Sequence, residues 1–145
     1  MPLALGFILI FNSNLIGLKK HEIPLGFKIE AFGTLMTALG LLFAVWGRIH
    51  LGKYWSGIIS LKEGHQLIRT GPYRLVRHPL YTGFLGGVLG STITAHTVEA
   101  GLGFFFMVIA YLIKIRREET LLTQQFGEEY LKFKRAVKKL IPYVL

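Results

Sequence analysis

Four apolar stretches, separated by polar segments, dominate the chain. They cover residues 2–18, 31–47, 79–97 and 100–113. A helix that crosses a bilayer needs roughly 20 mainly apolar residues, so the pattern predicts an all-α membrane protein with about four transmembrane helices. The second stretch is the clearest, because it carries no charge and has an interfacial aromatic, Trp46, near its end. Asn12, Ser13 and Asn14 interrupt the first stretch and weaken it.

Small residues recur along the third apolar stretch. They form two overlapping G-x-x-x-G patterns, made by Gly83, Gly86, Gly87 and Gly90. Glycines at this spacing let two helices approach each other closely in a membrane. Only a short turn at residues 96–99 separates this stretch from the fourth, so we expect the third and fourth helices to form a tight antiparallel pair.

The tail beyond the fourth apolar stretch has the composition of a soluble segment. Phe126 and Gly127 predict a break between two helices. Beyond the break, apolar side chains recur at helical spacing, with Lys and Arg on the other faces. This pattern predicts a C-terminal cytosolic amphipathic helix, ended by Pro142, that lies on the membrane surface, packs on the rest of the protein, or does both. The apolar positions are Tyr130, Phe133, Val137 and Leu140.

Composition and charge also indicate a membrane protein. Hydrophobic residues make up 52% of the 145 positions and the mean hydropathy is +0.47, more apolar surface than a small soluble domain can bury. The net charge of +9 comes from residues that flank the apolar stretches, which indicates a lipid bilayer as partner and no nucleic acid. Residues 48–78 hold six Lys and Arg and the tail from Lys114 holds eight. Both segments are therefore predicted to face the cytoplasm in a multi-pass protein.

Polar and rigid residues are concentrated in residues 65–83, which read HQLIRTGPYRLVRHPLYTG. Gly71 and Pro72 predict a turn, and Pro79 suits the first turn of a new helix. The three arginines of this segment are costly to bury, so we expect it at a water-facing edge. It is either a basic loop that fixes topology or a site for an anion or small polar ligand. No metal site is predicted, because its two histidines lie far apart and the chain has no Cys.

A second group of charges follows the fourth apolar stretch. Lys114 and Glu118 are four residues apart and therefore share one helix face. An ordinary ion pair at the end of a helix is one interpretation. The predicted topology also brings these charges to the same membrane face as His78 and Tyr81, so a shared site is the other.

Three motifs in this order resemble the isoprenylcysteine carboxyl methyltransferase and phospholipid methyltransferase superfamily. They are GPYRLVRHPLYTG, REETLL and FGEEYLKFKRAVKKLIP, and LGKYWS and GHQLI fit as well. The resemblance covers roughly residues 45–142. It implies one membrane methyltransferase domain over residues 1–145, with a cofactor-binding core at about 48–142 and S-adenosylmethionine as cofactor. The acceptor it implies is a lipophilic small molecule or a prenylated substrate.

The resemblance also implies roles for individual residues. Arg77 and Glu118 are expected to be catalytic, with Arg77 as a candidate contact for an anionic acceptor. Lys114 is expected to bind substrate, at a position where the carboxyl methyltransferases usually have Arg. The acceptor group, whether carboxylate, amine or thiol, stays open, as do an NADPH-dependent membrane reductase and a non-catalytic protein on the same scaffold. The expected cofactor-binding residues are His65, Gln66, Leu67, Ile68, Tyr73, His78, Pro79, Leu80, Tyr81 and Glu118.

Overall fold

The computed structural model describes residues 2–12, 22–24, 26–52 and 67–144. In this part of the chain every regular element is a helix, which confirms the predicted all-α class. The elements are α1 (Pro2–Phe11), α2 (Phe27–Leu51), the short 3₁₀ helix η3 (Gly71–Arg74), α3 (Pro79–Ala95), α4 (Val98–Phe126) and α5 (Glu128–Ala136).

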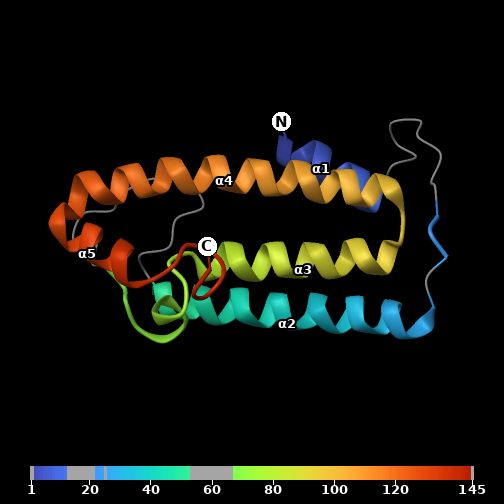
Figure 1. Cartoon of the computed structure of the whole chain (residues 1–145), viewed down its shortest axis with the longest axis horizontal. Helices are drawn as coiled ribbons and strands as arrows, with labels where there is room; N and C mark the ends of the chain where they lie inside the picture. The colour runs from blue at the N-terminus through green and yellow to red at the C-terminus, as the bar shows by residue number, and fades with distance from the viewer. Residues whose placement is uncertain (1, 13–21, 25, 53–66, 145) are drawn as a thin grey trace.

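The long helices lie side by side in an elongated bundle (Figure 1). α3 runs along α2, and α1 lies against the half of α4 that follows the α3–α4 turn. η3, α5 and the C-terminus gather at the opposite end of the bundle. Residues far apart in the sequence, from 67 to 144, therefore meet at that end.

Glycines hold α3 against α2 at backbone distance. A Cβ atom added at Gly90 would lie 2.5 Å from the carbonyl oxygen of Gly33 on α2, and one at Gly83 would lie 2.5 Å from the nitrogen of Ala44. Thr37 Oγ1 donates across the interface to the carbonyl of Gly87 at 3.2 Å. The predicted close approach is confirmed, but its predicted partner was wrong. The glycine face of α3 packs on α2 and not on α4. The spacing of glycines indicates that a helix can approach a neighbour closely, but it does not identify which helix that neighbour is.

A second pair of glycines joins α1 to α4. A Cβ at Gly103 would lie 2.6 Å from the carbonyl oxygen of Gly6, and one at Gly6 would lie 2.8 Å from the carbonyl oxygen of Gly103. Ile10 and Met107 are buried at the same interface. The bundle is thus built from two tightly packed helix pairs.

Large apolar side chains cover the outside of the bundle. Phe32, Leu35 and Leu42 on α2 are more than half exposed, and Phe105 on α4 is 58% exposed. Such a surface is far more apolar than the surface of a soluble monomer, and lipid chains would cover it without cost. By length and composition, α2 and α4 are long and apolar enough to cross a membrane. The described part of α1 has 10 residues, about 15 Å of helix, which is half of a bilayer core of roughly 30 Å.

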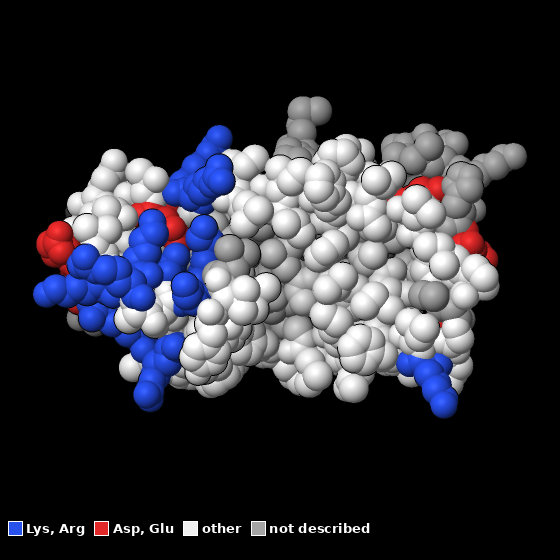
Figure 2. Space-filling view, in the orientation of Figure 1, with Lys and Arg blue, Asp and Glu red and all other residues white. Residues whose placement is uncertain are grey.

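The two ends of the bundle differ in charge. In Figure 2 most Lys and Arg side chains cluster at the end that carries α5 and η3, whereas acidic side chains are visible at both ends. Between the two ends, the face shown in Figure 2 carries no Lys, Arg, Asp or Glu of the described residues over its middle. The predicted gathering of residues 67–78 with the tail at one basic end is therefore confirmed.

Local turn signals were predicted correctly. η3 begins at Gly71, whose φ of 57° is in the left-handed region, and α3 begins at Pro79. α4 ends at Phe126, and Gly127 has φ of 52° between α4 and α5. Glycine reaches this region without steric cost, so the chain can turn sharply there.

The predicted end of the last helix was wrong. α5 stops at Ala136, and residues 137–140, here called the C-terminal strap, are not helical. The strap pairs with the segment before α3: the amide of Arg77 donates to the carbonyl of Lys138 at 2.8 Å, and that of His78 to Lys139 at 3.2 Å. These long-range bonds replace helical ones, which a pattern of apolar spacing does not reveal. Tyr130 and Phe133 of α5 are buried, so this apolar face packs on the protein.

Candidate functional site

The candidate site is at the basic end of the bundle, where the start of α3, the last turns of α4, α5 and the C-terminal strap meet. Thr82 on α3 adds a side-chain link, since its Oγ1 donates to the carbonyl of Leu140 at 2.8 Å. Together with the backbone pairing at Arg77 and His78, this bond fixes the His-Pro turn against the tail.

Arg77 is at the centre of this contact. Its Nε and Nη2 donate to Glu119 Oε1 at 3.0 and 2.7 Å. Its Nη1 donates to the carbonyl of Lys134 at 3.0 Å and also to that of Val137. These carbonyls lie at the C-terminal end of α5, where a cation is favoured by the helix dipole. Arg77 therefore links α4, α5 and the strap.

The expectation that all three arginines of this segment face water was wrong for Arg77. Its exposed fraction is 7%, whereas Arg69 and Arg74 are exposed. A buried guanidinium is tolerated when a carboxylate and carbonyl groups satisfy its donors. Glu119 supplies that carboxylate from α4.

Glu119 lies beyond the apolar part of α4 and receives three cationic or polar partners. Besides Arg77, His78 Nε2 lies 3.3 Å from Oε1 and Lys134 Nζ lies 3.1 Å from Oε2. Burial alone would raise the pKa of Glu119, but hydrogen bonds from His78, Arg77 and Lys134 hold it well below its ordinary value. Glu119 is therefore ionised and serves as the acceptor of a buried polar cluster.

Glu118, one residue earlier, faces a different environment. Its Oε2 is buried and has no hydrogen-bond partner in the described part of the chain. The ring nitrogen Nδ1 of His78 lies 3.7 Å from this oxygen, which is too far for a hydrogen bond. A buried carboxylate oxygen without a donor is costly, so this atom fits a ligand that brings a donor to it.

Aromatic side chains surround the same region. The rings of His78 and Tyr81 stack with centroids 5.7 Å apart, and Lys114 Nζ lies 5.3 Å from the centroid of Tyr81. No carboxylate of the described residues lies within ion-pair distance of Lys114, so the alternative of a Lys114–Glu118 helix-end pair is not observed there. His78, Tyr81, Lys114 and Glu118 are thus brought together as expected.

Tyr73 lies on the side of the candidate site that faces α2. It is buried, and its hydroxyl donates to the carbonyl of Gly47 at 3.5 Å. Burial, with a further contribution from the Glu118 carboxylate, raises the pKa of Tyr73 well above its ordinary value. The phenol therefore remains a neutral hydrogen-bond donor.

The other residues expected to bind the cofactor differ in how deeply they are buried. Pro79 is buried and Leu80 half-buried, and both pack beside Gly47 at the end of α2. Leu67 and Ile68 are half-buried, while His65 and Gln66 lie outside the described residues. In the part of the chain that the structure describes, no group of His, Asp and Glu side chains could hold a metal ion.

Sequence reasoning missed three members of this cluster. Glu119 was considered only as a neighbour of Glu118, and Lys134 and Tyr130 only as parts of an amphipathic pattern. A signal for Glu119 did exist, because it continues a buried row at intervals of four residues. That row comprises Met107, Tyr111, Ile115 and Glu119. Tyr130 is 1% exposed, its hydroxyl has no hydrogen-bond partner among the described residues, and burial raises its pKa.

Comparison with known sequences identifies the family. Residues 33–124, more than half of the chain, match the isoprenylcysteine carboxyl methyltransferase family. The chain belongs to this family. The predicted resemblance is thereby confirmed, and the matched residues include the arginine-rich segment, α3 and both glutamates of α4.

Several curated relatives of this isoprenylcysteine carboxyl methyltransferase family member carry the corresponding name. Protein-S-isoprenylcysteine O-methyltransferase A of Arabidopsis thaliana is 30% identical over 131 residues, which cover 88% of this chain and 64% of that protein. Protein-S-isoprenylcysteine O-methyltransferase of Saccharomyces cerevisiae is 31% identical over 120 residues, 76% of this chain and 50% of the yeast protein. The chain thus spans between half and two thirds of these relatives.

A further relative has a different name. The nickel-cobalt-cadmium resistance protein NccN of Alcaligenes xylosoxydans xylosoxydans is 38% identical over 92 residues, 62% of this chain and 41% of that protein. The family match ends at residue 124. α5 and the C-terminal strap of this family member, which complete the cluster around Arg77, follow the matched segment.

Proposed function

We propose that this chain transfers the methyl group of S-adenosylmethionine to the carboxylate of a membrane-associated isoprenylated cysteine. The observation that carries the proposal is the buried Oε2 of Glu118, which has no hydrogen-bond partner among the described residues and lies beside the stacked His78 and Tyr81 rings. The names of the relatives support the acceptor class. The NADPH-dependent reductase alternative is not favoured, because the family matched is one of methyltransferases.

The residues present fit the cofactor. S-adenosylmethionine carries ribose hydroxyls and an ammonium group, and each can donate a hydrogen bond to Glu118 Oε2. Its adenine suits an aromatic environment such as that of Tyr73 and Tyr81. When bound, it supplies an electrophilic methyl group. Glu118 and the aromatic rings would bind and orient it, and Leu67, Ile68, Pro79 and Leu80 would provide apolar walls.

Lys114 is placed for the acceptor. Its ammonium group lies over Tyr81, near the point where the apolar part of α4 ends. A carboxylate at the membrane surface would find this cation close to the cofactor residues. Methyl transfer is a displacement that depends mainly on proximity and alignment, so a nucleophilic side chain is not required.

We assign Arg77 a positioning role within this reaction. Its Nε, Nη1 and Nη2 donate to Glu119 and to the carbonyls of Lys134 and Val137. The guanidinium is thereby committed to protein groups, and its effect on the reaction passes through the placement of His78, the next residue in the chain.

We further propose a multi-pass arrangement with four crossings and with the site facing the cytoplasm. The concentration of Lys and Arg at the end with α5 and η3 supports this orientation (Figure 2). The chain has no native Cys, so Lys62→Cys and Gln125→Cys can be labelled individually. We expect an impermeant thiol reagent to reach both from the cytoplasmic face only. Labelling from opposite faces would contradict the arrangement.

Methyl transfer itself can be measured directly. Full-length protein in liposomes, given methyl-labelled S-adenosylmethionine and farnesylated cysteine, should yield a labelled ester. A farnesylated cysteine amide, which lacks the carboxylate, should remain unlabelled. Equal labelling of both compounds would reject the carboxylate as acceptor, and no labelling of either would reject the proposed activity.

A further inference from the structure

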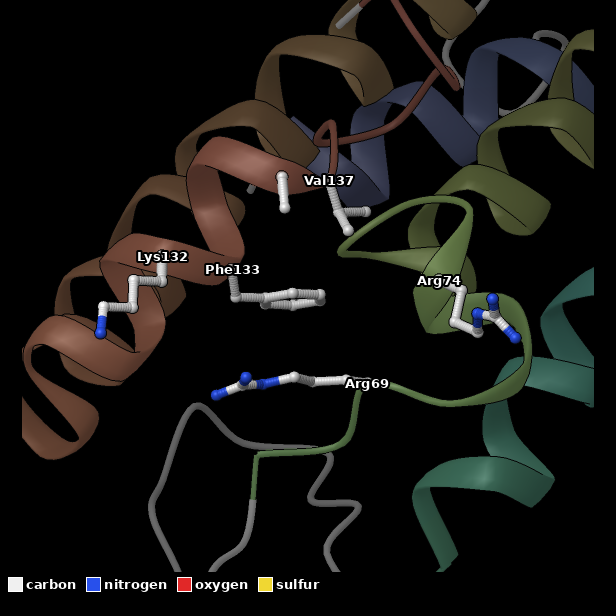
Figure 3. Close-up of a pocket in the computed structure, with 6 residues that line it drawn as sticks. Arg69, Arg74, Lys132, Phe133 and Val137 are labelled. Atoms are coloured by element: carbon white, nitrogen blue, oxygen red, sulfur yellow. The ribbon is translucent and has the colours of Figure 1, made fainter.

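A hollow lies at the basic end of the bundle, apart from the residues around Glu118. It has a volume of about 370 Å³ and is lined by Arg69 and Arg74 from one segment and by Lys132, Phe133, Ala136 and Val137 from α5 and its end. Figure 3 shows the Arg69 side chain running alongside the Phe133 ring, with Arg74 and Lys132 on opposite sides and their charged groups directed outward. The guanidinium carbon of Arg69 lies 5.9 Å from the centre of the Phe133 ring. The hollow therefore combines three cations with an apolar floor, and we call it the basic pocket.

The basic pocket differs from the cofactor site in its lining residues and in its charge. None of its lining residues is among those around Glu118, and its three cations would repel the sulfonium and ammonium groups of S-adenosylmethionine. Arg69 is partly neutralised, because its Nη2 forms an ion pair with Glu129. No carboxylate of the described residues is paired with Arg74 or Lys132. The pocket consequently favours an anion.

The position of the pocket selects the source of that anion. Arg74 follows Tyr73, whose hydroxyl contacts Gly47, at the level where the apolar part of α2 ends beside Trp46. Leu75, directly after Arg74, is 45% exposed, and Ile141, directly after the strap, is 52% exposed. Cations beside exposed apolar groups at the end of a membrane-facing helix match the headgroup region of a bilayer.

We propose that the basic pocket binds the phosphate of an anionic phospholipid. Arg69 supplies paired donors to the phosphate, the flexible Arg74 and Lys132 side chains turn toward it from either side, and Phe133 and Val137 contact the glycerol and the first carbons of the chains. A bound lipid would anchor α5 to the segment before η3. The inference is independent of the methyl-transfer proposal, because it concerns other residues and is tested by binding alone.

The test is native mass spectrometry of the full chain in a neutral detergent, titrated with phosphatidylglycerol or phosphatidylcholine. We expect preferential binding of phosphatidylglycerol, and a loss of about fivefold in affinity for Arg74→Gln and again for Lys132→Gln. Arg117→Gln removes an exposed charge from α4 outside the pocket and serves as the matched control, with a change of less than about twofold. Equal losses in all three variants, or equal binding of the two lipids, would overturn the proposal.

A gain of affinity gives an independent check. Glu129→Gln removes the carboxylate that competes for Arg69, and we expect it to tighten phosphatidylglycerol binding severalfold. Glu128→Gln removes the neighbouring charge, which pairs with Arg135 at 3.6 Å, and should have little effect. If both variants increased the affinity equally, the gain would come from the net charge of the protein, and this would contradict binding in the basic pocket. Displacement of the lipid by glycerol 3-phosphate or by farnesylated cysteine at equal concentration would reject the phospholipid as the occupant. Circular dichroism of each variant confirms that it is folded.

Discussion

Glu118 and Glu119 are neighbours in the sequence, yet their carboxylates lie in two different environments. Glu119 accepts from Arg77, His78 and Lys134 inside the protein. Glu118 keeps a buried oxygen without a hydrogen-bond partner among the described residues. Consecutive helix positions point about 100° apart, so one glutamate can serve the packing of the tail while the next faces a ligand.

This difference predicts separable effects of two isosteric substitutions. Glu118→Gln should weaken binding of S-adenosylhomocysteine, the demethylated cofactor, roughly tenfold, since a charged acceptor is lost. The free energy of unfolding should stay nearly unchanged. Glu119→Gln should instead lower that free energy by about 3–5 kcal/mol, because Arg77 would remain buried without its counter-charge. Calorimetry and chemical unfolding in detergent measure the two quantities.

Glu128→Gln, at an exposed position on α5, is the control for both measurements. If Glu119→Gln weakened cofactor binding more than Glu118→Gln did, with stability intact, the assignment of the two glutamates would have to be exchanged.

The Arg77→Lys variant tests the positioning role of Arg77. An ammonium group cannot reproduce the fork that joins Glu119 to the two carbonyls at the end of α5. We expect faster hydrogen exchange at the amides of positions 77 and 78, which donate to the strap, together with lower turnover. Arg74→Lys, at an exposed position three residues earlier, should leave both unchanged. A loss of turnover with unchanged exchange would mean that Arg77 acts on the substrate directly.

Two glycines of α3 test the contact with α2. Gly90→Ala places a methyl group against the backbone of Gly33 and Thr37, and neither can move away without shifting a helix. We expect a loss of about 1–3 kcal/mol in stability. Gly86→Ala is the matched control, because the nearest atom to its added Cβ lies 3.9 Å away. Thermal unfolding of the two variants in the same detergent compares them, and equal stability would contradict the observed packing of α3 on α2.

Local rules in the sequence predicted more of this protein than long-range ones. The turn at Gly71, the start of α3 at Pro79 and the break at Gly127 follow from backbone preferences of single residues. The end of α5 at Ala136 could not be predicted in this way, because it depends on backbone pairing with Arg77 and His78, some sixty positions away. The same holds for the burial of Arg77, which required knowing that Glu119 faces it.

For the site, the sequence motifs located His78, Tyr81, Lys114 and Glu118 through a family resemblance, and the structure brings these four together. The motifs did not indicate that Glu118 and Glu119 lie in different environments. This difference depends on which face of α4 is buried, and the packing of the helices determines that face.

Lys114 provides the last prediction, which concerns the acceptor. Its ammonium group lies over the ring of Tyr81 and has no carboxylate partner among the described residues, so its charge is available to an anion. Lys114→Met keeps much of the apolar stem and removes the charge. We expect it to lower turnover about tenfold or more, while leaving the affinity for S-adenosylhomocysteine nearly intact, because Glu118 and the aromatic rings are unchanged.

Lys114→Arg then reports on the class of acceptor. A guanidinium can bind both oxygens of a carboxylate, so a carboxylate acceptor should be methylated at an equal or higher rate by this variant. A thiol or amine acceptor gains nothing from the exchange. Steady-state rates with farnesylated cysteine, measured for the wild type and both variants, make the comparison. A full rate in Lys114→Met, with unaltered folding, would remove Lys114 from the site and leave the carboxylate without an assigned cation, since the donors of Arg77 are committed to Glu119 and the tail.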